Sequence, residues 1–288
     1  MMDLAPLESL YDVEHGSDLP LPSELAMLYG RLSFPAHADR LHVVGNFVTT
    51  LDGVVSLNMP GHSSGGDISG FNQHDRVVMG LLRAAADAVI VGAGTLRAEP
   101  FHCWTAEYVY PPFAEAYRTL RTNLRKSKPP LNVIITSSGD INLDLPVFQS
   151  GEVPVLIVTT TRGSQHIHER DVPSSVQVMA LPGDDRLSAQ AILEIVNDMC
   201  RSDLVLVEGG PQLMGDFLAE RCLHELFLTL APQIAGRDGS TERPGFVAGK
   251  RFAPEQPLWG TLVSVKCASN HLFLRYTFST VTGTPIRS

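Results

Sequence analysis

The sequence predicts an α/β protein with three layers, in which helices cover both faces of a mostly parallel central sheet. Three observations support this prediction. Short apolar runs, typical of strands buried on both faces, alternate with amphipathic segments through most of the chain. Two of these runs end in glycine turns, at Gly92 and Gly209. The last two β-rich segments surround a short polar turn and are expected to form an antiparallel hairpin at one edge of the sheet.

The elements are expected in the following order. Residues 1–40 are rich in proline, which breaks long elements. We expect them to form an arm on the domain or on a partner subunit, and a partly disordered tail is an equally good alternative. Ser23 is expected to cap a helix over 23–31. Strands are expected at 41–49, 88–91, 131–136, 153–159, 176–181, 204–207 and 225–230, and in the hairpin at 258–266 and 271–278. Helices are expected at 72–86, 113–125, 188–199 and 212–220.

The connecting segments complete the expected organisation. The glycine- and serine-rich stretch 60–70 is expected to be a flexible loop, of the kind that often forms a lid. Residues 101–110 form an aromatic-rich loop, and 232–249 form an excursion rich in glycine and proline. No linker divides the chain after the arm, so residues 41–288 are expected to form one domain.

Composition excludes several classes of function. The chain has 288 residues and a formal net charge of −9, which argues against a nucleic-acid partner. No apolar run approaches the roughly 20 residues of a membrane span. The four cysteines form no Cys-x-x-Cys pair, and the first residues lack a signal-peptide core, so a reduced cytoplasmic protein is expected. No metal site is expected, because His166 and His168 form a pair without further ligands.

The two glycine turns are the main candidates for a binding site. Glu208 ends the strand at 204–207 and is followed by Gly209, Gly210 and Pro211, a residue suited to the first position of a helix. A helix that begins at a glycine turn offers free N–H groups to a phosphate. An ordinary tight turn is the alternative. The second turn, Gly92-Ala93-Gly94-Thr95, follows a neighbouring strand. Two such turns predict a crevice at the carboxyl ends of the strands, where open α/β sheets bind ligands.

Two further sets of polar residues lie at strand ends. Asp52 stands in an Asp-Gly turn after the strand at 41–49, where it is either a turn residue or a substrate contact. Thr159, Thr160, Thr161 and Arg162 end another strand. Their donors suit a nucleotide phosphate, and a solvated loop is the alternative. Together these sets and the glycine turns fit a phosphorylated cofactor that carries out hydride transfer.

Three groups of residues resemble the reductase domain of the bifunctional riboflavin-biosynthesis deaminase–reductase family. They are Asn46-Phe47-Val48-Thr49-Thr50-Leu51-Asp52-Gly53, then Leu82-Arg83-Ala84 with 87–95, and Val207-Glu208-Gly209-Gly210-Pro211, with support from 225–236. The resemblance covers roughly 41–280. It implies a dihydrofolate-reductase-like fold, a homodimer, and reduction of the ribose of a phosphorylated pyrimidine to a ribityl chain by NADPH. The zinc signature of the family's deaminase domain is not found in these residues.

The resemblance also assigns roles to residues. For the substrate, it implies contacts from Asp52, Ser64, Arg83 and Glu208, of which Asp52 and Glu208 are the catalytic candidates. For NADPH, it implies contacts on the nicotinamide side, at the pyrophosphate and near the 2′-phosphate. These cofactor candidates are Thr49, Gly92, Ala93, Gly94, Thr95, Glu99, Thr159, Thr160, Thr161, Arg162, Gly209, Gly210, Pro211, Gln212 and Leu213.

The sequence departs from the family in its substrate half. Val54 stands where the family has Lys or Arg, 65–69 replace a Ser-x-Trp-Ile-Thr element, and 98–103 replace an Asp-x-Pro-x-Leu-Thr-x-Arg segment. Phosphate is normally held by Arg or Lys, so the loss of these basic residues leaves the identity of the substrate undetermined. The alternatives are the riboflavin intermediate, another small molecule such as a dihydropterin, or a non-catalytic protein that binds NADPH.

Overall fold

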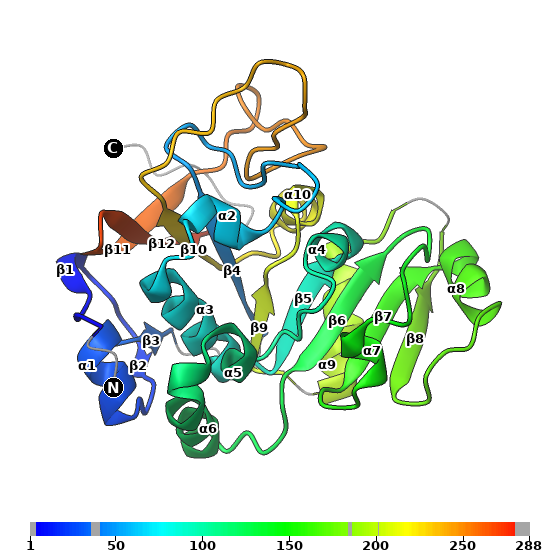
Figure 1. Cartoon of the computed structure of the whole chain (residues 1–288), viewed down its shortest axis with the longest axis horizontal. Coiled ribbons are helices and arrows are strands. Elements are labelled where there is room, and N and C mark those ends of the chain that lie inside the picture. The colour runs from blue at the N-terminus through cyan, green and yellow to red at the C-terminus, as the bar shows by residue number, and fades with distance from the viewer. Residues whose placement is uncertain (1–3, 36–40, 184–185, 201, 280–288) are drawn as a thin grey trace.

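The computed structural model describes residues 4–35, 41–183, 186–200 and 202–279 (Figure 1). The strands are β1 (Glu8–Asp12), β2 (Ser17–Asp18), β3 (Ser33–Phe34), β4 (His42–Thr49), β5 (Ala88–Gly92), β6 (Leu131–Thr136), β7 (Val155–Thr160), β8 (Val176–Leu181), β9 (Leu204–Val207), β10 (Glu225–Leu230), β11 (Gly260–Ala268) and β12 (His271–Phe278). The helices are α1 (Ser23–Tyr29), α2 (Gly65–Ser69), α3 (Gln73–Ala85), α4 (Ala93–Ala98), α5 (Ala106–Val109), the 3₁₀ turn η1 (Pro111–Phe113), α6 (Ala114–Asn123), α7 (Pro146–Gln149), α8 (Thr161–His168), α9 (Ala189–Cys200) and α10 (Pro211–Ala219).

One large sheet organises the chain, in the order β1-β11-β12-β10-β4-β9-β5-β6-β7-β8. The seven strands from β10 to β8 pair in parallel. Strands β12, β11 and β1 extend one side of the sheet in antiparallel pairing. The predicted parallel sheet and C-terminal hairpin are therefore confirmed. Strand β9 lies between β4 and β5, although it comes far later in the sequence, and this insertion brings its glycine turn beside that of β5.

Successive strand residues point into two separate cores, which is why the apolar runs lack alternation. In β4, Val43 packs with α9 and α10 on one face, while Val44 packs with α3 and α6 on the other. Figure 1 shows α3, α5 and α6 in front of the sheet and α9 behind it. None of the helices in the described ranges is long and apolar enough to cross a membrane.

The described part of the N-terminal arm lies on the domain. Strand β1 pairs with β11, and a buried ion cluster anchors the following residues. In this cluster, Arg275 Nη1 is 3.1 Å from Glu14 Oε2, and Arg275 Nε is 2.5 Å from Glu225 Oε2. All three side chains are buried, and the guanidinium of Arg275 in the sheet pairs with carboxylates from both the arm and the sheet. Residues 1–3 and 36–40 of the predicted arm, and 280–288 of the predicted domain, lie outside the described ranges.

The structure corrects two local predictions. The predicted cap of α1 was wrong: Pro22 occupies the N-cap position, and the Ser23 hydroxyl instead donates to Glu24 at 3.0 Å. The predicted loop at 60–70 contains a short helix, α2, whose N-cap is Ser64. Ser64 and Asp67 form a reciprocal capping box, so side-chain hydrogen bonds fix this segment where glycine content alone indicated a mobile one.

Candidate functional site

A groove runs over the carboxyl ends of β9, β5 and β6, at the position that the two glycine turns predict. It has two halves, with cavity volumes of about 480 Å³ and about 560 Å³. The first half lies toward β4 and contains Glu208, and the second lies toward β6 and the start of α10. Gly94, Arg97, Gly210 and Pro211 line both halves, so the halves are continuous.

The turn after β9 is built for close approach of backbone. A Cβ atom on Gly209 would lie 2.3 Å from Leu213 Cδ2 and 3.1 Å from the Gly92 backbone nitrogen, so a side chain there would displace Leu213 and press on the neighbouring turn. A Cβ atom on Gly210 would meet nothing nearer than Thr95 Oγ1, at 3.8 Å. Gly210 therefore borders open space in the groove. It is also the N-cap of α10, which has no side-chain cap and begins with Pro211 as predicted.

Glu208 lines the first half, two positions before Gly210, which lines both halves. Its carboxylate is fixed from two sides. Arg83, from α3, places its Nε and Nη2 atoms each 2.8 Å from Glu208 Oε2. Asn46, from β4, donates to Glu208 Oε1 at 3.1 Å. The Arg83 and Glu208 side chains are only 3% and 6% exposed. Glu208 thus bonds to side chains from α3 and β4.

A chain of hydrogen bonds continues from Arg83 to Glu99. Arg83 Nη1 is 2.6 Å from His102 Nε2, and His102 Nδ1 is 2.8 Å from Glu99 Oε2. Because Arg83 can only donate, His102 accepts at Nε2 and donates to Glu99 from Nδ1. Burial and the charge of Arg83 lower the pKa of His102, in agreement with this neutral form. Burial raises the pKa of Glu99, but the hydrogen bond from His102, the nearby positive charge and the Gly65 amide together outweigh it, so the net shift is downward.

Asp75 is a second buried carboxyl in the same half of the groove. It lies in the first turn of α3 and is 5% exposed. Burial raises its pKa, and this effect outweighs the hydrogen bonds from the side chains of Thr229 and Ser69. Glu208 and Asp75 thus face one cavity in different electrostatic surroundings.

The second half of the groove carries the features of a phosphate site. The start of α10 lines it, including Gln212 and Leu213, and so does the turn after β5. Three cations line it: Arg97, Arg186 and Lys250. Lys250 Nζ is 2.8 Å from Asp216 Oδ1. In the described ranges, no group of three or more His, Cys, Asp or Glu residues is arranged to hold a metal ion.

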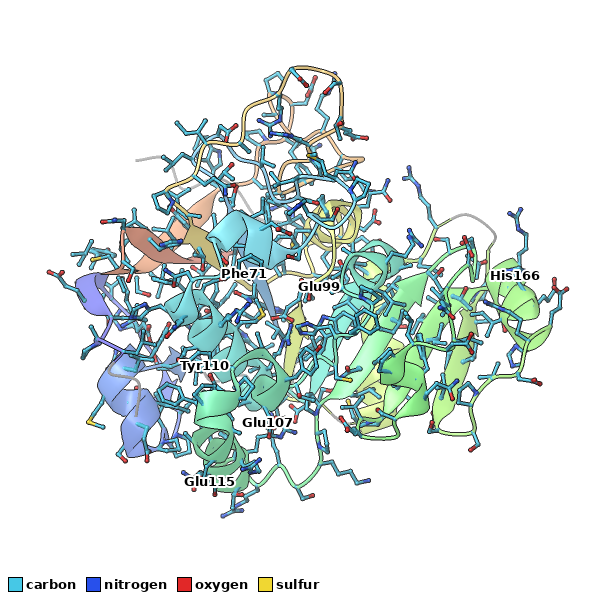
Figure 2. All side chains as sticks on the ribbon, viewed as in Figure 1. Phe71, Glu99, Glu107, Tyr110, Glu115 and His166 are labelled. Atoms are coloured by element: carbon cyan, nitrogen blue, oxygen red, sulfur yellow. The ribbon has the colours of Figure 1, made fainter. Side chains whose placement is uncertain are left out.

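The structure brings many of the predicted site residues into this groove. Those that line one or both halves are Gly92, Ala93, Gly94, Thr95, Glu99, Arg83, Glu208, Gly209, Gly210, Pro211, Gln212 and Leu213. Figure 2 shows Glu99 near the centre of the molecule, between the ribbons of α3 and α4, and His166 on its outer rim.

Asp52 does not line the groove, and its carboxylate instead accepts hydrogen bonds within a neighbouring loop. Its carboxylate accepts from Thr50 Oγ1 at 2.6 Å, and from the backbone nitrogens of Ala235 and Gly236 at 3.0 Å and 2.8 Å. The bond from Thr50, with the two amides, lowers the pKa of Asp52 to about 2. These contacts match the turn-residue interpretation, in which Asp52 ties 50–54 to the excursion after β10.

The predicted 2′-phosphate cluster is not brought to the groove. Thr159 and Thr160 are fully buried in β7, and Thr160 Oγ1 donates to the Ser137 carbonyl while capping α8. Thr161 and Arg162 are exposed in the first turn of α8, and neither lines the groove halves.

Two other assigned residues also serve local structure. The Thr49 hydroxyl bonds to backbone carbonyls of the 50–54 turn. Ser64 caps α2 and lines only a smaller recess beside the first half, which it shares with Arg97.

Among the residues that sequence reasoning missed, Asn46, Asp75, Arg97 and Trp104 line the first half, and His102 contacts Arg83. A polar Asn46 within an otherwise apolar strand was a usable signal. Asp75 instead matched the ordinary pattern of an acidic residue in the first turn of a helix. His102 and Trp104 lie in a loop whose path only the tertiary structure defines.

Comparison with known proteins places the chain among reductases. A family model described as the RibD C-terminal domain matches residues 41–263. A 2,5-diamino-6-ribosylamino-4(3H)-pyrimidinone 5′-phosphate reductase from Aquifex aeolicus is 26% identical over 172 residues, which cover 59% of this chain and 66% of that protein. A reductase of the same description from Archaeoglobus fulgidus is 24% identical over 203 residues, covering 70% and 85%. The Aquifex aeolicus RibD protein is 26% identical, and only 40% of its length is matched.

Solved structures share the fold. A pyrimidine reductase-like protein from Corynebacterium diphtheriae has a TM-score of 0.68 at 20% identity, with 88% of this chain and 98% of that chain covered. Acinetobacter baumannii RibD has a TM-score of 0.62 at 19% identity, with 83% and 58% covered. These likenesses confirm the fold that the sequence resemblance implied.

Proposed function

The chain belongs to the RibD C-terminal domain family, and we propose that it is an NADPH-dependent reductase of a pyrimidine intermediate of riboflavin biosynthesis. The observation that carries this proposal is the position of Glu208. Its ion-paired carboxylate lines the polar first half of the groove, two positions before Gly210, which lines both halves and is the N-cap of α10. This arrangement suits a cofactor that reaches along the groove and a substrate that meets its reactive end.

The second half of the groove is proposed to hold the cofactor. NADPH would place its pyrophosphate against Gly210 and the uncapped start of α10, where N–H groups and the helix dipole favour negative charge. The turn at 92–95 would border the nicotinamide. Arg186, rather than the more distant Arg162, is the cation whose position in the groove suits a 2′-phosphate. When bound, NADPH supplies the hydride.

The first half is proposed to hold the substrate. Arg83 keeps Glu208 in place as a hydrogen-bond acceptor, so Glu208 can orient an N–H or O–H group of the substrate beside the nicotinamide. Arg97 lines this half and the small recess beside it, together with Asn58 and Ser63. These three side chains are the groups available there to receive a phosphate at the outer end of the substrate.

A substrate without phosphate is the second candidate, and one observation favours it. Val54, which replaces the family's basic residue, is 0% exposed and packs in an apolar cluster. The lining of the first half contains Asp75, Glu99 and Glu208 against only two cations, Arg83 and Arg97. An unphosphorylated molecule such as a dihydropterin suits that balance better than a phosphate ester does.

The test is NADPH oxidation with each candidate substrate, followed by mass spectrometry of the product. We expect turnover of the phosphorylated ribosylamino-pyrimidine, with a product that is heavier by two hydrogen atoms. Faster turnover of its dephosphorylated form would select the second candidate. NADPH binding without turnover of any candidate would identify a non-catalytic binding protein. The predicted homodimer stays a prediction, to be tested by light scattering during gel filtration.

A further inference from the structure

Asp75 lines the substrate half and is buried, and the helix cap does not explain why it is there. Its backbone nitrogen donates to Asn72 Oδ1 at 3.1 Å, so Asn72 caps α3 and the Asp75 side chain is not needed for capping. The side chain instead lines the same cavity as Glu208. A buried carboxyl costs stability unless it is paired or protonated, so its presence calls for a reason.

The groups around Asp75 come from four elements, and they do not provide an ion pair. The side chains of Thr229, on β10, and Ser69, on α2, hydrogen-bond to its carboxyl. His271, on β12, and Glu208, at the end of β9, are the titratable groups that face it. Within the described ranges no cation lies within 4 Å of Asp75, because the Arg83 guanidinium on the same helix pairs with Glu208. Burial and the Glu208 charge both favour the protonated form of Asp75.

The proposed reduction needs a proton as well as a hydride. Transfer of the hydride to the carbon of a C=N group moves the π electron pair to nitrogen, which must then gain a proton. Glu208 is a poor source, because its two carboxylate oxygens already accept from Arg83 and Asn46. In many enzymes one carboxyl of such a pair is bonded to polar or charged groups and stays an anion, while the other is buried away from cations and donates a proton.

We propose that Asp75 is the proton donor of this reductase, an inference that rests on the proposed function. The C–H bond of the dihydronicotinamide breaks and a C–H bond forms at the substrate carbon. The Asp75 O–H bond breaks and an N–H bond forms at the substrate nitrogen. NADPH is oxidised to NADP⁺, the substrate is reduced, and Asp75 regains its proton from solvent. Glu208 stays bound to Arg83 and Asn46 and orients the substrate.

The first test is turnover of Asp75→Asn beside Asp198→Asn, which removes an exposed carboxyl from α9 on the other face of the sheet. Asp75→Asn should lower kcat by about a hundredfold or more, the usual contribution of a positioned acid, with an unchanged Kd for NADPH. Asp75→Glu should recover part of the loss. Asp198→Asn should behave like the unmodified protein. Full kcat in a folded Asp75→Asn protein, or a rise in KM alone, would overturn the assignment.

The pH profile provides the second test and does not require Asp75→Asn to fold well. A donor must be protonated, so kcat of the unmodified protein should fall as pH rises through the pKa of Asp75. Carboxyl NMR of the unliganded protein measures that pKa directly, with Asp52 as an internal carboxyl of lowered pKa. A carboxyl signal for Asp75 that titrates below its ordinary 3.8 would overturn the inference. If the unmodified protein oxidises no NADPH with any candidate, the proposed function fails instead, whatever the titration shows.

Discussion

The buried pair between Arg83 and Glu208 should couple strongly, and a double-mutant cycle measures that coupling. Glu208→Gln keeps a neutral acceptor but leaves the Arg83 charge in a site that is 3% exposed. Removal of one partner of a buried pair lowers the free energy of unfolding by about 3–5 kcal/mol. Because the Gln amide still accepts a hydrogen bond, Glu208→Gln should cost about 3 kcal/mol, at the lower end of this range. Arg83→Met should cost a similar amount, because Glu208 then keeps only Asn46. The double variant should lose about 3 kcal/mol rather than about 6, a coupling of about 3 kcal/mol.

Urea unfolding of the four proteins gives these free energies, provided that the slope against urea stays constant. The matched control is the exposed pair of Arg118 and Glu115, whose side chains are 57% and 84% exposed. Arg118 Nη2 lies 2.8 Å from Glu115 Oε2, the same separation as in the buried pair. Its coupling should be much smaller than that of the buried pair, because water screens exposed charges. The same Glu208→Gln protein should bind NADPH almost normally, with kcat lower by about a hundredfold. Coupling in the buried pair no larger than in the exposed pair would refute the reasoning.

Three further predictions concern the ends of the groove and the loop beside it. Arg186→Ala should reduce the preference for NADPH over NADH by about tenfold, the worth of one charge-assisted hydrogen bond. Arg162→Ala should leave the ratio of the two Kd values unchanged. If Arg162→Ala lowers the preference and Arg186→Ala does not, the 2′-phosphate binds at α8, as the sequence predicted. Arg97→Met should raise KM for a phosphorylated substrate by about tenfold and leave KM for its dephosphorylated form unaltered, and equal effects on both would show that Arg97 holds no phosphate. The pKa of Asp52 is lowered to about 2 in the folded protein, so the carboxylate stabilises 235–236 fully above its ordinary pKa of 3.8, and this stabilisation is lost as pH falls through about 2. Hydrogen exchange of the backbone amides at 235–236 should therefore accelerate over that pH range in the unmodified protein. It should not do so in Asp52→Asn.

The fold was predictable because its local signals agree. Strands β6, β8, β9 and β10 begin and end at the residues that their apolar runs indicate. Strand β1 was missed because all five of its side chains are exposed, so no hydrophobic pattern marks it. Its pairing with β11 joins opposite ends of the chain, and the side-chain contact between Lys266 and Asp12 that adds to it is also distant in sequence.

The candidate site was predictable only where backbone chemistry defines it. Glycine and proline preferences mark the turn at Gly209 in any sequence, and the start of α10 follows from them. The roles of side chains depend on contacts distant in sequence. Thr160 looked like a phosphate ligand but is a helix cap, and Asp75 looked like a helix-start residue but lines the cavity. Arg83 and Glu208 are 125 positions apart, so their ion pair follows from the insertion of β9 between β4 and β5.

Gly210 offers a test of where the cofactor binds, because the unliganded protein can accept a side chain there. Its backbone φ of −64° is ordinary for any residue, and an added Cβ would have no neighbour closer than 3.8 Å. Gly210→Val should therefore fold and fill the space that the pyrophosphate needs. Ala180→Val, at an exposed position of β8, adds the same side chain away from the groove.

Calorimetric titration of NADPH into the unmodified protein, Gly210→Val and Ala180→Val tests the central claim most directly. If the groove over β9 and β5 is the cofactor site, Gly210→Val should retain its melting temperature and lose at least about tenfold in NADPH affinity, or about 1.4 kcal/mol, while Ala180→Val binds like the unmodified protein. Equal NADPH affinity in all three folded proteins would contradict the claim and move the cofactor away from this groove.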